Sequence, residues 1–245
     1  MRNSELWLPT KVALTGPDNQ LKIPANSKEL SPGSTLIATL AAYWYQRNLK
    51  LYARGTLLEL GCGKMPYRAL YANHVENIIA TDWPGSLHGQ RFLDFSADLT
   101  RGIPLSNDAV DTVIASDLLE HIYKPHELLH EIYRIMKPGG YALLNIPFLY
   151  WVHEAPHDYY RYTQHALRRM VADSGFNIEN LTAFGGHAYV IADIIGKMLQ
   201  RLPYIGSASA RLSQRIVLAI QGNEHTSENY PLMMGLVITK PATTH

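Results

Sequence analysis

The chain has 245 residues, 47% of them hydrophobic and 18% charged, enough to bury the core of one α/β domain. Its 22 basic and 21 acidic residues leave a formal charge of +1, so the composition argues against electrostatic binding of a nucleic-acid backbone. A single cysteine, Cys62, excludes an internal disulfide framework. No secretory apolar stretch follows the first residues and no run of about 20 apolar residues occurs, so we expect a cytoplasmic protein without a membrane span.

Residues 1–54 are expected to form an arm followed by a helix. Prolines and glycines interrupt residues 1–33, which is typical of an extended segment rather than of a regular element. From Ser34 to about Tyr52, apolar residues recur at helical spacing and predict a helix ahead of the first strand. We therefore place the main domain at residues 55–245.

Strands and helices alternate from residue 55 onwards. The expected strands cover 56–60, 78–81, 110–115, 141–146, 176–181 and 232–239, and helices are expected from Pro66, Pro125 and Thr163. Pro138-Gly139-Gly140 is expected to end the second of these helices, and Thr163 to cap the third. The alternation predicts the α/β class.

Residues 185–222 are expected to form a helical insertion before the last strand. Two apolar stripes at helical spacing run through it, with Lys197, Arg201, Arg211 and Arg215 beside them. Such stripes can pack on the sheet, cover an apolar substrate, contact a membrane surface or join two copies of the chain. Peripheral membrane contact and a homodimer therefore both remain open.

A glycine loop follows the first predicted strand. The apolar run before it leads directly into Gly61-Cys62-Gly63, where glycine allows the backbone to approach a ligand closely. Asp82 ends the second apolar run, 19 residues after Gly63, and can accept hydrogen bonds from ribose hydroxyls. The pair predicts a nucleoside cofactor, and Pro66, where a dinucleotide fingerprint has a third glycine, disfavours NAD.

These motifs carry a resemblance to a known family. The matching segments are Glu59-Leu60-Gly61-Cys62-Gly63, Asp82, Ala97-Asp98-Leu99, Ser116-Asp117-Leu118-Leu119-Glu120-His121 and Met136-Lys137-Pro138-Gly139-Gly140. In order and spacing they resemble class I S-adenosylmethionine-dependent methyltransferases, in particular their bacterial small-molecule, type 11-like branch. The resemblance covers residues 55–184 and implies a Rossmann-like, doubly wound sheet of seven mostly parallel strands with an antiparallel last strand.

The resemblance also implies a site for S-adenosylmethionine. Its implied residues are Gly61 and Gly63 beside the methionine part, with Cys62 between them in the cofactor loop, Asp82 at the ribose, Trp83 on the adenine face, Asp98 and the Leu99 backbone at the adenine edge, Ser116 and Asp117 closing the methionine side, and Glu59 orienting the glycine loop. Two of these have alternatives, because Asp98 can instead cap a turn and Trp83 can instead pack in the core. No metal ligand set is expected.

The candidate catalytic residues lie mainly in the segment 147–162, after the fifth strand. Ligands in such sheets bind beyond the carboxyl ends of the strands, so His153 or His157 can act as a base, oriented by Glu154 or Asp158. Alternatively, Asp158, Tyr160 and Arg161 pin this loop to the domain. His121, four residues after Asp117, is either a further base or a wall of the site.

The sequence thus predicts a methyltransferase acting on a small-molecule, glycan or natural-product acceptor, at oxygen rather than nitrogen. A nucleotide- or NAD-dependent Rossmann enzyme shares the glycine loop and Asp82 but leaves Pro66 unexplained. An aminopropyl transferase calls for a more acidic acceptor loop than 147–162. A non-catalytic module that binds S-adenosylmethionine is the remaining alternative.

Overall fold

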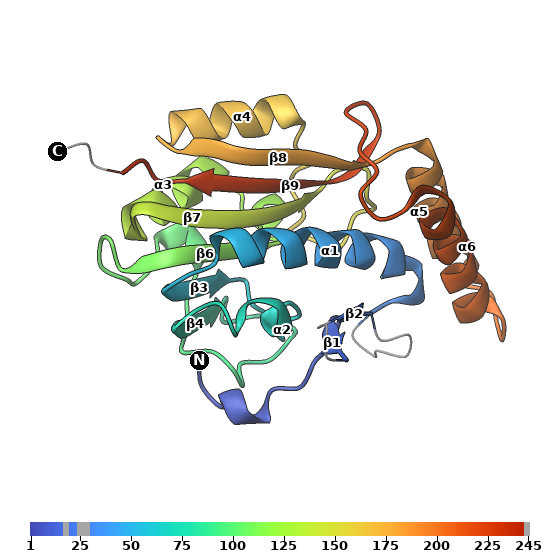
Figure 1. Ribbon diagram of the computed structural model, residues 1–245, viewed down its shortest axis with the longest axis horizontal. Helices are drawn as coiled ribbons and strands as arrows, with labels where there is room; N and C mark the ends of the chain where they lie inside the picture. Colours follow the sequence, from blue (N-terminus) through green and yellow to red (C-terminus); the bar gives the residue numbers. More distant parts are fainter. Residues whose placement is uncertain (17–19, 24–29, 243–245) are drawn as a thin grey trace.

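The computed structural model describes residues 1–16, 20–23 and 30–242, and in this part of the chain seven strands form one sheet (Figure 1). Their order is β5-β4-β3-β6-β7-β9-β8, and β9 runs antiparallel to both of its neighbours. The strands are β3 (Thr56–Leu60), β4 (Asn77–Asp82), β5 (Phe95–Ser96), β6 (Val110–Ser116), β7 (Met136–Pro147), β8 (Asn177–Gly185) and β9 (Pro231–Thr239). The predicted fold class is confirmed.

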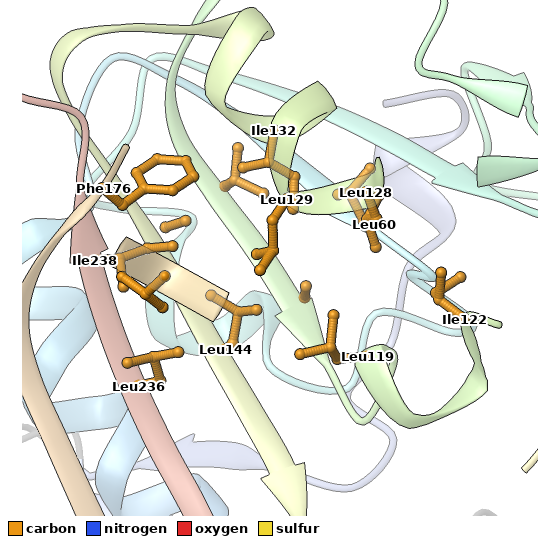
Figure 2. Close-up of a cluster of buried hydrophobic side chains, with 14 of the residues drawn as sticks. Leu60, Leu119, Ile122, Leu128, Leu129, Ile132, Leu144, Phe176, Leu236 and Ile238 are labelled. Atoms are coloured by element: carbon orange, nitrogen blue, oxygen red, sulfur yellow. The ribbon is translucent and has the colours of Figure 1, made fainter. Parts of the chain in front are cut away.

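Helices cover both faces of this sheet, because neighbouring strand residues point to opposite sides. Leu58, Val113 and Leu144 face α3 (Pro125–Ile135) and α4 (Gln164–Asp173), in the core that Figure 2 shows. The residues beside them along the strands, such as Leu57 and Ile114, face α1 (Thr35–Tyr52) and α2 (Arg68–Tyr71). The helix predicted over 34–52 is therefore confirmed and packs directly on the sheet.

The start of β7 differs from the expectation. The sequence predicts that Pro138-Gly139-Gly140 separates the helix from a strand at 141–146, but β7 already begins at Met136. Its pairing with β6 jumps from Val110↔Met136 to Thr112↔Tyr141, so the segment between forms a bulge. Gly139 has a φ of 79°, a left-handed conformation that glycine adopts without strain and that makes this bulge possible.

The N-terminal arm is more regular than its composition predicts. It contains a turn of 3-10 helix at Ser4–Leu6 and a short hairpin of β1 (Ala13–Thr15) and β2 (Gln20–Lys22). The expectation of an arm without regular elements was therefore wrong for these segments, while residues 17–19 and 24–29 of the same arm lie outside the described residues. Thr163 caps α4 as predicted, by accepting a bond from the Ala166 N–H.

The predicted insertion consists of α5 (His187–Leu199) and α6 (Gly206–Gln221), which lie side by side at one end of the sheet (Figure 1). Most members of their apolar stripes point outward, but Val217 is buried in the core on the sheet, and Gly196 and Gln214 lie at the contact between the two helices. The exposed members are Ile191, Ile194, Ile195, Met198, Leu212, Ile216 and Ile220. Contact of this face with a membrane or a second copy stays a prediction.

Lys197 does not flank the outer stripe as the sequence predicts. Its side chain is buried, makes an ion pair with Asp193 one helical turn earlier, and lies 3.9 Å from the centroid of the Tyr150 ring. Aromatic and ionic partners stabilise the buried ammonium group, so this lysine faces inward. In the described part of the chain, none of the helices has the length and apolar character that a bilayer crossing requires.

Candidate active site

The main cavity lies beyond the carboxyl ends of the parallel strands. The chain runs outward from β3 through β4 to β5 and then crosses back to β6, so the loops after β3 and β6 diverge and leave a crevice. The pocket there has a volume of about 730 Å³, within the range of small-molecule sites. Its wall brings together all of the predicted cofactor residues: Glu59, Gly61, Cys62, Gly63, Asp82, Trp83, Asp98, Leu99, Ser116 and Asp117.

Asp82 holds the glycine loop in place. One carboxylate oxygen, Oδ2, accepts bonds from the Gly63 N–H at 3.1 Å and the Ser86 hydroxyl at 2.8 Å, while Oδ1 accepts from the Trp83 N–H at 2.8 Å. Gly61 and Gly63 have φ values of 61° and 50°. Residues other than glycine adopt this left-handed conformation only with strain. The loop therefore turns its backbone toward the pocket in a fixed conformation.

Trp83 and Asp98 also line the pocket. Trp83 is 49% exposed and its ring lies over Gly85, so the alternative of core packing was wrong. Asp98 accepts bonds from the Thr100 N–H at 3.0 Å and the Thr100 hydroxyl at 2.6 Å, and thus caps the 3-10 turn Leu99–Arg101. These bonds lower the pKa of Asp98. Binding of an adenine amino group by Asp98 stays a prediction.

At the end of β6, Asp117 lies beside a buried amide. Asn145 of β7 donates to Asp117 Oδ1 at 2.6 Å, and the Asp117 N–H donates to the Asn145 carbonyl at 2.9 Å. Asp117 has a φ of 47°, a left-handed conformation that turns the chain sharply away from the strand. The carboxylate therefore sits on the pocket wall with Ser116, in a position to meet a cationic group.

An ion pair within the loop 147–162 braces its conformation. Arg161 binds both carboxylate oxygens of Asp158, at 2.6 and 2.7 Å, and also donates to the carbonyls of Tyr150 and Trp151. Burial opposes ionisation of Asp158, but the bonds from Arg161 and from the His153 N–H outweigh it and lower the pKa of Asp158 to about 2. Tyr160 ties the loop to the carbonyl of Tyr123. Of the three residues in the pinning alternative, Tyr160 therefore bonds to the rest of the domain, whereas Asp158 and Arg161 brace the loop internally.

The candidate histidines occupy different places. His157 and His121 line the main pocket, whereas His153 lines a smaller adjoining cavity of about 140 Å³ together with His121. Asp158 lines neither cavity, and its carboxylate contacts His153 and Arg161, so its role in orienting a catalytic histidine stays a prediction. Burial lowers the pKa of His153.

Comparison of the sequence with known protein families identifies the family of this chain. Residues 35–181 match the family described as "Methyltransferase domain", which spans more than half of the chain. The chain belongs to this methyltransferase domain family. The family predicted from the sequence motifs is therefore confirmed, and the match includes α1, the glycine loop and every predicted cofactor residue.

Curated relatives of this methyltransferase domain are distant. A probable S-adenosylmethionine-dependent methyltransferase of Mycolicibacterium smegmatis is 26% identical over 145 residues, which cover 54% of this chain and 55% of that protein. An uncharacterized methyltransferase-like protein of Schizosaccharomyces pombe is 31% identical over 103 residues, 40% of each chain. The chain thus spans about half the length, or less, of the curated relatives it matches.

Solved structures share the fold of the methyltransferase domain. A methyltransferase from Archaeoglobus fulgidus has a TM-score of 0.55 at 16% identity and covers 82% of this chain and 93% of its own. The [4+2]-cyclase SpnF has a TM-score of 0.57 at 15% identity, covering 84% of this chain and 82% of its own. One of these neighbours is named for methyl transfer and the other for a cyclisation, so the likeness shows the architecture alone.

Several residues that line the pocket of the methyltransferase domain could not be predicted from a sequence pattern. Thr10 and Lys11 bring the N-terminal arm to the pocket wall, a role that its composition does not indicate. His88 lies 3.9 Å from Glu154 and connects the loop after β4 with the loop after β7. The Glu154 carboxylate raises the pKa of His88. Such contacts between distant loops can be recognised only in the folded chain.

Glu59, near the end of β3, is buried and borders the pocket. It accepts a hydrogen bond from the Tyr71 hydroxyl of α2, and burial raises its pKa to about 8. The sequence places it as a support for the glycine loop, whereas the bond in the structure holds α2. At neutral pH this carboxyl group is therefore mainly protonated.

We predict that Glu59→Gln removes a pH dependence of stability. Because the folded pKa of about 8 exceeds the ordinary value of 4.5, the folded state holds one more proton than the unfolded state between these pH values. Stability should then fall as the pH rises through this window, by at most about 1.4 kcal/mol per pH unit. Urea unfolding of both proteins at pH 5.5, 6.5 and 7.5 measures the difference, and parallel curves would contradict the shift.

Proposed function

We propose that the protein transfers a methyl group from S-adenosylmethionine to a small-molecule acceptor, with oxygen favoured over nitrogen. The observation that carries this proposal is the glycine loop with two left-handed glycines, bonded to Asp82 in a pocket of about 730 Å³. The methyltransferase family assignment supports the same activity. When bound, S-adenosylmethionine supplies an electrophilic methyl group for an in-line displacement.

The residues present fit this cofactor. Among the described residues, Asp82 Oδ1 accepts one bond, from the Trp83 N–H, and so keeps acceptor capacity for a ribose hydroxyl. Exposed Trp83 offers a ring face to adenine, and Asp117 offers a negative charge at the methionine side. Gly61 and Gly63 leave room for close approach of the cofactor to the backbone.

A dinucleotide fits less well. Rossmann dehydrogenases bind the pyrophosphate at the N-terminus of the helix that follows the glycine loop. Here Pro66 stands in that segment, and the helix that follows, α2, has four residues. So short a helix has a small dipole and few free N–H groups aimed at a phosphate. This favours S-adenosylmethionine over NAD.

Two features of the site support a hydroxyl acceptor. His157 lines the pocket, and its Nδ1 lies 3.0 Å from the Tyr159 hydroxyl oxygen, so Nδ1–H can donate there and leave Nε2 to take a proton. The rings of Trp83 and His157 meet edge to face, with centroids 5.5 Å apart. The base would then stand beside the cofactor end of the pocket.

Calorimetric titration with S-adenosylmethionine, S-adenosylhomocysteine and NAD tests the proposal. We expect micromolar binding of both sulfur compounds and none of NAD. Binding is then followed by a screen with methyl-labelled cofactor against hydroxyl and amine acceptors, in which His157→Gln should slow hydroxyl methylation at least tenfold. Failure to bind either sulfur compound would refute the cofactor, and binding without any transfer would favour the non-catalytic alternative.

A further inference from the structure

Three side chains with metal-ligand atoms converge beside the main pocket. Glu120 and His121 belong to the turn Leu119–His121 after β6, and His153 comes from the loop after β7. The two Nε2 atoms of His121 and His153 are 3.2 Å apart, and Glu120 Oε1 lies 3.7 Å from each. The three atoms thus surround one small space.

The hydrogen bonds of the two histidines turn their lone pairs toward each other. His121 Nδ1 lies 2.9 Å from the His157 carbonyl, which can only accept, so Nδ1 carries the proton. His153 Nδ1 lies 3.2 Å from Asp158 Oδ2 and 3.3 Å from the Trp151 carbonyl, again two acceptors. With neutral rings, both Nε2 atoms are therefore acceptors that face each other without a proton between them.

Glu120 adds a buried carboxyl group without a hydrogen-bond partner. Its side chain is 0% exposed, and neither oxygen has a partner among the described residues. A buried carboxylate without a donor is costly, and such groups are normally paired or bound to a metal. Two imidazole lone pairs and one carboxylate group therefore converge on a space where a cation could bind all three.

We propose that Glu120, His121 and His153 bind a divalent transition-metal ion of the zinc class. Bonds of about 2.0–2.1 Å at tetrahedral or octahedral angles put ligand atoms about 2.9–3.4 Å apart, and the spacings of 3.2 and 3.7 Å need only small movements to reach this. Two histidines and one glutamate are a ligand set of catalytic zinc sites. The Nδ1 bonds to a carbonyl and a carboxylate are the supports that such ligands normally have.

The place of the site suggests a role for the ion. His121 lines both the main pocket and the smaller cavity, and His153 lines the smaller one, so an ion held by these side chains would lie where the two cavities adjoin. A cation there would bind an acceptor hydroxyl and lower its pKa, so that His157 Nε2 takes the proton, the oxygen bonds the methyl carbon, and the sulfur leaves as S-adenosylhomocysteine. This role rests on the proposed function, whereas metal binding itself does not.

Metal titration of untagged, chelator-treated protein tests the site. We expect one Co²⁺ per chain, seen as a visible absorption band of low-symmetry coordination, and displacement of that band by Zn²⁺. Glu120→Gln keeps the side-chain shape and His153→Ala removes a half-buried ligand, and each should weaken binding at least 30-fold. His165→Ala, an exposed histidine on α4, is the matched control and should change the affinity less than twofold.

Two results would overturn the proposal: no stoichiometric binding of Co²⁺ or Zn²⁺, or binding that both ligand variants leave unchanged. Thermal unfolding of every sample shows whether the variants are folded, and each sample is also titrated with S-adenosylmethionine. This titration separates the two proposals. Cofactor binding without metal binding refutes the metal site alone, and metal binding without cofactor binding refutes the proposed function alone.

Discussion

Replacing Asp82 by asparagine is expected to weaken S-adenosylmethionine binding by roughly 100-fold, about 2.7 kcal/mol. The carboxylate accepts the Gly63 and Trp83 N–H groups and also faces the pocket, so it both shapes the glycine loop and receives the ribose. Hydrogen bonds to a charged acceptor contribute about 1.5–3 kcal/mol each, and the amide loses that charge and presents an NH₂ group on one side. The loss should therefore exceed that of one ordinary hydrogen bond.

Calorimetry on the Asp82→Asn protein measures this loss, with thermal unfolding as the check that the fold survives. Asp173→Asn is the matched control, since Asp173 is an exposed residue on α4 that pairs with Arg169. Its affinity for the cofactor should equal that of the unchanged protein. An Asp82→Asn protein with an affinity within threefold of the original would place the ribose elsewhere in the pocket.

Local patterns in the sequence were sufficient to predict which residues line the main pocket. A strand that ends in Gly61-Cys62-Gly63 needs no distant partner to be recognised, because its geometry follows from glycine and from the strand before it. Asp82 ends the next parallel strand, and neighbouring parallel strands end at the same edge of a sheet. The glycine loop and Asp82 therefore lie at the same pocket as a result of local strand pairing.

Contacts between distant segments could not be predicted in this way. Glu120 belongs to an expected motif, but its isolation from hydrogen-bond donors arises only when the loop after β7 folds over it. The outward apolar stripe of α5 is a second example, because helical periodicity shows that a stripe exists but not which way it faces. Lys197 was misplaced for the same reason, since its partners Tyr150 and Trp151 lie in another loop.

The second large effect is expected from Arg161→Met. Asp158 has a side-chain exposure of 2%, and loss of Arg161 would leave its carboxylate buried with bonds from His153 alone. Breaking a buried ion pair costs about 3–5 kcal/mol, and partial exposure of the arginine reduces this here to about 2 kcal/mol. The loop 147–162 should then open about 30-fold more often, while the cofactor affinity changes less than threefold.

Hydrogen exchange of the Tyr159 amide reports the opening, because this N–H donates to the Glu120 carbonyl across the loop. The double variant Arg161→Met with Asp158→Asn separates two causes. An uncharged amide can remain buried and still accept the His153 N–H, so the double variant should recover more than half of the protection that Arg161→Met loses. No recovery would mean that Arg161 holds the loop through the carbonyls of Tyr150 and Trp151, and that the charge of Asp158 matters little.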